Sequence, residues 1–252
     1  MSTPGKLKKY LDKPLNFSGK LCKQPIIIAD SKGEYLKRQA SNIFQPYCHV
    51  EFECRKGARY PEYYQWLIKN LDRKVNQFGN IVLYIFLGTC DLTKLNVSVD
   101  KNSRRQKRYI ELRHNDDKSA VSYLIDQINK FYFFVSNFPS VSIVFLEIPP
   151  YCIREWNRLQ GHPDPAIFAD QDTKLYERIS IVNEYIQGVN SLSHVQSPRF
   201  NLYLKRGRKE KGSSHRKYTL FFANYKDGIH SKPLLARCWM KEILIQIFRD
   251  CA

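Results

Sequence analysis

Residues 25–33 read Pro25-Ile26-Ile27-Ile28-Ala29-Asp30-Ser31-Lys32-Gly33, and this stretch decides the fold that the sequence predicts. Three branched apolar residues in a row indicate a short strand buried on both faces, which is typical of a parallel sheet covered by helices. Asp30, Ser31 and Gly33 then predict a tight turn, and helix formers follow from Glu34 to Phe44. We therefore expect Ser31 between the end of a strand and the start of a helix.

This position is a suitable one for a nucleophile. Open α/β sheets bind their ligands at the carboxyl ends of the strands, and a helix N-terminus adds backbone donors and a partial positive charge. On this stretch by itself, however, an N-cap pair is the simpler interpretation of Asp30-Ser31.

The remaining chain alternates between strand and helix patterns. Strict alternation of apolar and polar residues predicts an edge strand over 48–54, and continuous apolar runs predict buried strands over 81–87 and 141–148. Helical spacing of apolar residues predicts helices over 64–78, 121–135 and 175–189 and a last helix that ends at 248. Asp172 or Thr173 is the expected cap of the third helix, and Ser231 is the expected cap of the last. We expect a loop or lid over 151–172 and a hairpin from strands at 200–204 and 218–222. This order predicts an α/β fold, a three-layer α/β/α sandwich around a mostly parallel sheet.

Composition sets further bounds. The 252 residues fit one domain, which we place at 25–252 after a basic, poorly ordered lead-in at 1–24. Seven cysteines without a C-x-x-C pair suggest neither a disulfide framework nor a zinc site. The sequence contains no apolar run long enough to cross a membrane and no apolar signal core near Met1, so we expect an intracellular protein, cytoplasmic or nuclear.

The net charge of +17 is the most unusual bulk feature, and it favours polyanionic partners such as nucleic acid. Two segments concentrate this charge, at 101–113 and 199–217. Solvated loops that keep the protein soluble are the alternative interpretation. The candidate nucleic-acid-binding residues are Arg104, Arg105, Lys107, Arg108, Lys205, Arg206, Arg208 and Lys209.

Two more polar turns compete for the same crevice. Gly88-Thr89-Cys90-Asp91 follows the apolar strand at 81–87, and Asp227-Gly228-Ile229-His230 precedes the last helix. An Asp and a His three residues apart are close enough for the carboxylate to accept a hydrogen bond from one imidazole nitrogen. The other nitrogen is then free to take a proton from a serine. Taken singly, a D-x-x-H pattern is more simply a turn and a helix start.

Together, these turns resemble the blocks of the SGNH (GDSL-type) hydrolase and esterase superfamily. That family has a G-D-S turn after its first strand, a glycine after the second, G-x-N-D after the third and D-x-x-H near the carboxyl end. The matching residues are Ala29-Asp30-Ser31, Gly57, Gly88-Thr89-Cys90-Asp91 and Asp227-Gly228-Ile229-His230. The resemblance covers about residues 25–250 and implies the SGNH fold with a flavodoxin-like sheet.

The resemblance also implies roles for individual residues. Ser31 would be the nucleophile, His230 the general base and Asp227 the residue that orients it. The oxyanion hole would use the backbone N–H groups of Ser31 and Gly57 and the side chain at the asparagine position of G-x-N-D, which is Cys90. A thiol is a weak donor, and loss of one oxyanion donor typically costs about 10²–10³ in kcat. Asp30, Gly88 and Asp91 would support the motifs, and Ala29 replaces a family glycine.

Three functional hypotheses follow. The first is a serine hydrolase that cleaves a small ester or an acetyl group through an acyl-serine, with no cofactor and no metal. The second is an idle SGNH fold that acts as a basic nucleic-acid-binding or interaction module, since SGNH-like domains occur beside nucleic-acid binding in some LINE retrotransposons. The third and weakest uses Asp30, Asp91 and Asp227 as carboxylate ligands of a divalent metal.

Overall fold

The centre of the molecule is a parallel sheet. The computed structural model describes residues 3–15, 17, 20–44, 49–99, 106–114, 116–209 and 216–252. Within these ranges the sheet contains β1 (Gln24–Ala29), β2 (Glu51–Cys54), β3 (Ile81–Phe86) and β6 (Val141–Phe145), in the spatial order β2-β1-β3-β6. This is the doubly wound, flavodoxin-like order, so strand β1, which carries the three isoleucines, has a neighbour on each side.

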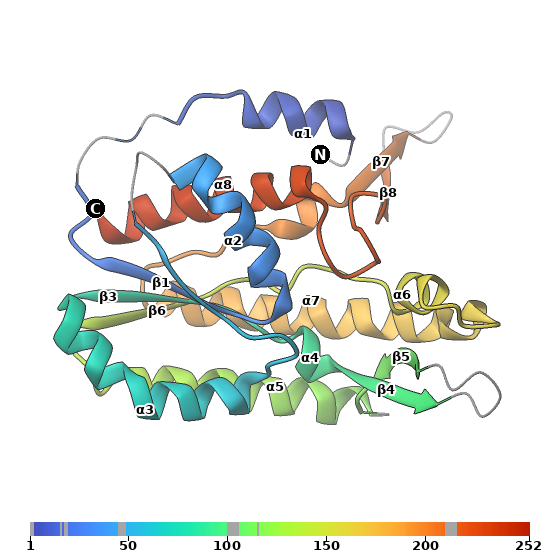
Figure 1. The fold of residues 1–252 in the computed structure, drawn as a ribbon, viewed down its shortest axis with the longest axis horizontal. Coiled ribbons are helices and arrows are strands. Elements are labelled where there is room, and N and C mark those ends of the chain that lie inside the picture. Colours follow the sequence, from blue (N-terminus) through green and yellow to red (C-terminus); the bar gives the residue numbers. More distant parts are fainter. Residues whose placement is uncertain are drawn as a thin grey trace.

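Helices cover both faces of the sheet (Figure 1). On one face lie α2 (Ser31–Phe44) and α8 (Pro233–Cys251), with α1 (Pro4–Leu11) packed against α8. On the other face lie α3 (Tyr60–Phe78), α5 (Asp117–Val135) and α7 (Ala169–Leu192). Alternate residues of β1 enter the two cores, because Ile26 and Ile28 pack on the α3 side and Ile27 on the α8 side. The predicted three-layer α/β/α architecture is confirmed.

The lead-in and the expected lid differ from the prediction. Residues 4–11 form helix α1, whose Leu7 is fully buried against α8. Tyr10 and Leu11 pack beside it, and Lys241 of α8 donates hydrogen bonds to the carbonyls of both. The expected loop at 151–172 contains α6 (Ile153–Leu159) and the 3₁₀-helix η1 (Pro165–Phe168). Asp172 does not cap α7, which begins at Ala169. Its carboxylate instead accepts hydrogen bonds from the N–H of Ile153 and the thiol of Cys152 at the start of α6.

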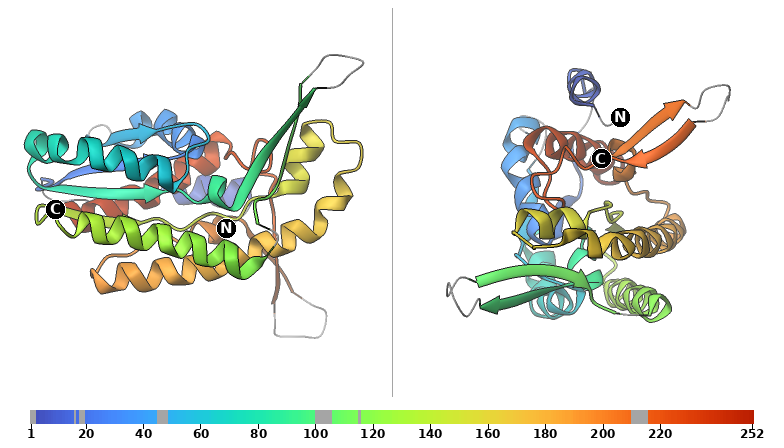
Figure 2. Two further views of the ribbon diagram at one scale, coloured as in Figure 1. Left: turned by 90° about the horizontal axis from the view of Figure 1, so that it is seen from below. Right: turned by 90° about the vertical axis from the view of Figure 1, so that its right-hand side faces the viewer.

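The two basic segments form hairpins. β4 (Thr93–Val99) pairs with β5 (Gln106–Leu112), and β7 (Lys205–Lys209) pairs with β8 (Arg216–Leu220). The second hairpin was predicted, but the strand expected at 200–204 is not found there. Those residues form the 3₁₀-helix η2 (Phe200–Tyr203) and Leu204, and the first strand of the hairpin begins at Lys205. Both hairpins project from the body of the molecule (Figure 2). Both lie at the carboxyl end of the sheet. The first is placed there because β4 directly follows the short helix α4 (Thr89–Leu92), which itself follows β3.

The outer edge of β6 is closed by side-chain amides instead of another strand. Asn190 accepts a hydrogen bond from the N–H of Phe145 at 3.0 Å and donates one to its carbonyl at 2.7 Å. Asn183, seven residues earlier on the same face of α7, makes the same pair of bonds with Ile148. The two amides satisfy backbone groups that would otherwise be buried without partners, and they protect an exposed sheet edge.

Replacing Asn190 by alanine should therefore destabilise the fold far more than replacing an exposed asparagine. The change leaves one N–H and one C=O of Phe145 unsatisfied, at a cost of about 1–3 kcal/mol each. Asn76→Ala, at an exposed position of α3, is the matched control and should stay within about 0.5 kcal/mol of the wild type. Urea denaturation measures both, and equal stabilities of the two variants would contradict the proposed role of the amide.

Candidate active site

Ser31 and His230 meet at the carboxyl end of β1. Ser31 is the first residue of α2, and its Oγ lies 3.0 Å from Nε2 of His230, which stands two residues before the N-cap of α8. These residues are 199 positions apart in the chain, and the central position of β1 brings them together. The contact is of hydrogen-bond length, so a proton can pass directly from the hydroxyl to the imidazole.

Asp227 holds the imidazole in position. Its Oδ2 lies 2.8 Å from Nδ1 of His230, and its Oδ1 accepts hydrogen bonds from the N–H groups of Ile229 and His230. Burial acts to raise the pKa of Asp227, but the hydrogen bonds from His230 outweigh it, and the pKa is lowered. The carboxylate is thus ionised and accepts the Nδ1 proton, which leaves Nε2 as the acceptor that faces Ser31.

Gly228 is required in this loop for two reasons. Its φ is +85°, which L side chains rarely adopt, and a Cβ would lie 2.9 Å from the carbonyl oxygen of Cys152. The N–H of Cys152 in turn donates to the carbonyl of Gly228 at 3.0 Å. The loop that carries Asp227 and His230 is therefore packed directly against the start of α6.

Two aromatic rings flank His230. Tyr35, one turn after Ser31 on α2, stacks on the imidazole with ring centroids 4.7 Å apart and planes 24° apart. Trp156 of α6 lies at 5.8 Å with a tilted ring. The rings restrict the rotation of the imidazole.

The candidate oxyanion residues lie on the two turns beside Ser31. The register pairs Ala29 with Cys54 of β2 and with Phe86 of β3, so Gly57 and Cys90 follow the neighbouring strands just beyond the same sheet edge. Gly57 has a φ of +72°, and Gly88, the N-cap of α4, has a φ of +109°. Burial raises the pKa of the Cys90 thiol to about 12, which keeps it protonated and able to donate weakly.

Ala29 and Gly33 share a tight contact between β1 and α2. Ala29 ends β1 and, like all described non-glycine residues except His194, has no positive φ, so alanine is tolerated at this position of the family motif. Gly33 was predicted to permit the turn, but it lies in the first turn of α2. A Cβ there would come within 2.4 Å of the Ala29 methyl group and 2.6 Å of the Cys54 sulfur. Its role is close packing of helix on strand.

Asp30 faces the protein interior. Its carboxylate accepts hydrogen bonds from the N–H of Lys32 at 2.8 Å and from Lys32 Nζ at 2.6 Å, and both side chains are almost fully buried. The same ammonium group contacts the hydroxyl of Thr89, next to Cys90. Lys32 therefore links the turn after β1 to the turn after β3.

Asp91 links the turn after β3 to the helix after β2. Its carboxylate accepts long hydrogen bonds, of 3.3 and 3.4 Å, from the N–H of Tyr60 in the first turn of α3. Burial raises the pKa of Asp91 to about 7, and the Tyr60 N–H and the charge of Arg59 offset only part of this effect. Asp91 therefore joins the turn after β3 to the first turn of α3.

The three aspartates of the metal hypothesis do not converge. Asp30 pairs with Lys32, Asp91 with the backbone of Tyr60, and Asp227 with His230. Among the described residues, no group of three or more His, Cys, Asp or Glu side chains is arranged to hold a metal ion. The arrangement therefore offers no support for metal-assisted phosphoryl chemistry.

The basic residues of the sequence analysis lie outside this crevice. Lys107 and Arg108 are on β5, and Lys205, Arg206, Arg208 and Lys209 are on β7, whereas Arg104 and Arg105 fall outside the described residues. Within the described ranges, no helix has the length and apolar character that crossing a membrane requires.

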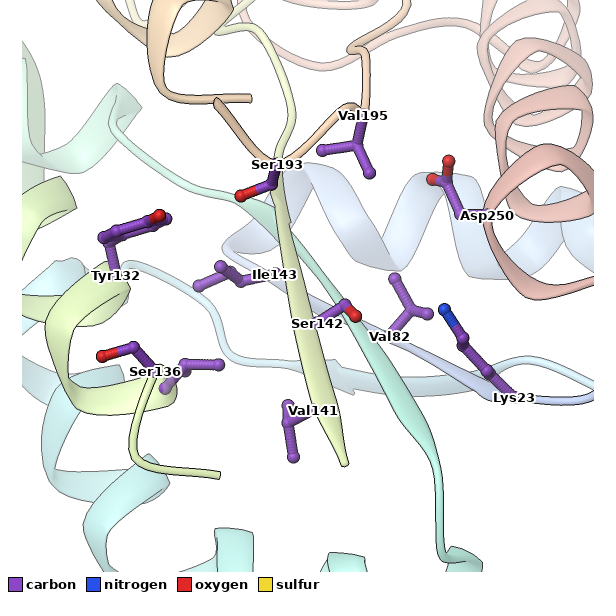
Figure 3. Close-up of a pocket in the computed structure, with 11 residues that line it drawn as sticks. Lys23, Val82, Tyr132, Ser136, Val141, Ser142, Ile143, Ser193, Val195 and Asp250 are labelled. Carbon is purple, nitrogen blue, oxygen red and sulfur yellow. The ribbon is translucent and has the colours of Figure 1, made fainter. Parts of the chain in front are cut away.

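A pocket of about 250 Å³ lies at the opposite end of the sheet (Figure 3). Val82, Val141 and Ile143 of β3 and β6 line it, with Lys23 and Asp250 at one side. It contains none of the candidate catalytic residues, and the amino ends of strands are not where open α/β sheets bind substrates.

Sequence reasoning missed Lys32, Tyr35 and Trp156. A lysine beside a motif serine has no periodic signal, and its burial follows from a partner, Thr89, that is 57 residues away. Tyr35 could have been found, because a residue four positions after Ser31 lies on the same face of α2. Trp156 was placed in a loop or lid, and its position against His230 depends on the packing of α6.

Comparisons with known proteins support the fold. No family model and no curated protein matches the chain. Among solved structures, a GDSL-like lipase from Bacteroides thetaiotaomicron superposes with a TM-score of 0.59 at 12% identity, over 98% of this chain and 100% of that one. An acetyl xylan esterase from Geobacillus stearothermophilus gives 0.51 at 13% identity, over 89% and 94%. A lipase/acylhydrolase from Enterococcus faecalis gives 0.50 at 11%, over 91% and 97%.

The parallel sheet, its strand order and these neighbours define the fold of the protein. The chain has the SGNH (GDSL-type) hydrolase fold, and the resemblance stated on the sequence motifs is confirmed at the level of fold.

The raised pKa of Asp91 predicts a pH-dependent effect of Asp91→Asn on stability. Because the folded-state pKa of about 7 exceeds the ordinary value of 3.8, the wild-type carboxyl favours folding below about pH 4, and this contribution is lost as the pH rises through 7. Asparagine cannot ionise. Between about pH 4 and 7, the free energy of unfolding of the variant minus that of the wild type should therefore increase by up to about 1.4 kcal/mol per pH unit.

Urea denaturation at several pH values measures this difference. A difference between variant and wild type that stays constant over the same range would show that Asp91 titrates in the folded protein as it does in the unfolded chain.

Proposed function

We propose that the protein is a serine ester hydrolase that acts through an acyl-serine intermediate. The observation that carries this proposal is the continuous set of contacts from Ser31 Oγ to His230 Nε2 and from His230 Nδ1 to Asp227 Oδ2, at 3.0 and 2.8 Å. This is the arrangement that nucleophilic catalysis by serine requires.

In the proposed first step, Ser31 Oγ attacks the carbonyl carbon of the ester while His230 Nε2 takes the hydroxyl proton. The carbonyl π electrons move to oxygen and form a tetrahedral oxyanion, and the imidazolium is stabilised by Asp227. When the intermediate collapses, the carbon–oxygen bond to the leaving group breaks and His230 returns the proton to that oxygen. Water, activated by the same imidazole, then hydrolyses the acyl-serine.

The oxyanion hole of this proposal uses the N–H of Ser31, the N–H of Gly57 and the thiol of Cys90. Ser31 begins α2, and the first N–H groups of a helix have no partner within it. Cys90 supplies weaker support than the family's asparagine would. We therefore expect a working but slow enzyme, with Thr89 beside Cys90 as a further polar group.

For the substrate, we propose a small ester or an acetylated molecule. The solved structures with the same fold include proteins described as an acetyl xylan esterase and as lipases, which supports an acyl ester as the reacting group. The chemistry needs no cofactor, because serine, imidazole and water supply every proton and electron pair.

A second candidate function is favoured by the two basic hairpins. They project from the end of the sheet that carries the candidate site, and β7 and β8 contain six cationic residues and no acid. In this alternative the crevice is idle and the chain acts as a nucleic-acid-binding or interaction module. An idle crevice would leave Ser31 unreactive even in a Cys90→Asn variant.

The decisive experiment is the rate of covalent labelling of Ser31 by a fluorophosphonate probe. Labelling should be lost in Ser31→Ala, fall at least about 10²-fold in His230→Ala, and rise by as much as about 10²-fold in Cys90→Asn, which restores an oxyanion donor. Ser122→Ala, an exposed serine of α5, is the matched control and should label at the wild-type rate.

Mass spectrometry of the labelled peptide checks the position. Absence of labelling in both wild type and Cys90→Asn, with cooperative thermal unfolding of both, would overturn the hydrolase proposal in favour of the idle fold. Equal labelling of Ser31→Ala would place the reactive group elsewhere.

A further inference from the structure

A second pocket lies beside the candidate active site, on the far side of the start of α6. It has a volume of about 450 Å³ and is lined by the start of α6, the first turns of α7 and the base of the β7–β8 hairpin. Cys152 contributes to its wall and also donates its N–H to the carbonyl of Gly228, so one layer of backbone separates the pocket from the loop of His230. None of Ser31, Asp227 and His230 lines it.

Two exposed tyrosines border this pocket. Tyr218 of β8 is 60% exposed and Tyr176 of α7 is 37% exposed. The residue opposite Tyr218 on β7 is Gly207, so the directly opposite position carries no side chain. An aromatic ring held on a strand opposite a glycine is a flat surface on which another ring can stack.

The charge of the pocket is positive. Arg154 and Lys205 line it together with one acid, Asp172. The Asp172 carboxylate is already engaged, because it accepts hydrogen bonds from the Cys152 thiol and from the N–H groups of Ile153 and Arg154. Arg154 Nε lies 3.9 Å from this carboxylate, which leaves Lys205, among the described lining residues, as the cation without an acid beside it in the pocket. On the hairpin, Lys205 lies on the same strand face as Tyr218, whereas Arg206 and Lys217 alternate to the other face.

We propose that this pocket binds single-stranded nucleic acid, with one base stacked on Tyr218 and the adjoining phosphates on Lys205 and Arg154. Successive nucleotides of a single strand present a ring and an anionic group in alternation, and the pocket offers the complementary pair. Stacking on an aromatic ring is tolerant of sequence, so the site binds a strand without reading it.

The details favour a single strand over a duplex or a lipid surface. Bases in a duplex are already stacked on each other and cannot enter a pocket of this kind. An anionic membrane would need a broad apolar face on the hairpin, but its two strands carry six cationic residues, and Tyr218 and Leu220 are their apolar members. The β4–β5 hairpin is different, since Leu95, Val97 and Val99 are exposed on β4.

Fluorescence anisotropy with a labelled oligothymidylate of about 15 nucleotides tests the proposal, in the full chain and in Ser31→Ala. Tyr218→Ala should weaken binding about 5-fold or more with an unchanged salt dependence, because stacking is not electrostatic. Lys205→Gln combined with Arg154→Gln should lower the slope of log K against log salt by about 1.4, since two phosphate contacts are lost. Lys69→Gln combined with Arg73→Gln, on exposed positions of α3 across the sheet, removes the same charge and should change affinity less than about twofold.

Several results would overturn the proposal. One is failure of the oligonucleotide to bind at low salt, and another is an α3 variant that weakens binding as much as the pocket variant does. A third is a duplex of the same length that binds with equal affinity while Tyr218→Ala has no effect. The last is a protein that binds vesicles of phosphatidylserine and phosphatidylcholine without binding the oligonucleotide. Binding that is unchanged in Ser31→Ala would show that the site operates independently of the proposed hydrolase. Failure of fluorophosphonate labelling would overturn the hydrolase proposal and leave this binding proposal unaffected.

Discussion

The candidate site depends on a buried ion pair between Asp30 and Lys32. The two charges lie on either side of Ser31 in the chain, both are removed from water, and the ammonium also contacts Thr89. Desolvating such charges is costly, and the cost is offset only when geometry and additional hydrogen bonds are good. The N–H of Lys32 supplies one of these bonds to Asp30, so the ion pair and the first turn of α2 stabilise each other. The direction of the Ser31 side chain follows from that turn.

Other contacts between the turns complete this framework. The carbonyl of Ala29 accepts hydrogen bonds from the N–H of Arg55 and from the hydroxyl of Tyr63, which fixes the turn after β2. Asp91 caps α3 from the turn after β3. The carbonyl of Thr89 accepts hydrogen bonds from the hydroxyls of Thr93 and Tyr151. Three turns from separate strands are thus joined directly to one another, and a crevice built in this way is organised before a substrate arrives.

Much of the framework could be predicted from the sequence. Ile26 to Ile28 specify a central strand because a run of branched apolar residues has no exposed face, and the motif turns follow from where such strands end. Side chains whose role depends on distant partners could not be predicted. Lys32 is buried because of Thr89 and Asp30, and Asp172 caps α6 although its position suggested α7. The basic segments were ambiguous because charge does not distinguish a solvated loop from a hairpin, whereas the antiparallel register of β7 and β8 does. Leu7 showed too short an apolar pattern to indicate that α1 would pack against α8.

The replacement at position 90 also has a physical explanation in this framework. The structural contacts of the turn after β3 use Thr89, Asp91 and the backbone carbonyl of Cys90, so they require no particular side chain at position 90. The hydrogen bond between Ser31 and His230 is also dispensable for folding, since a partly buried bond of this kind contributes only about 0.5–1.5 kcal/mol. Stability therefore does not account for the alignment of Ser31, His230 and Asp227. Two rings packed on the imidazole and a glycine with a positive φ in its loop hold that alignment, which fits the proposed nucleophilic chemistry.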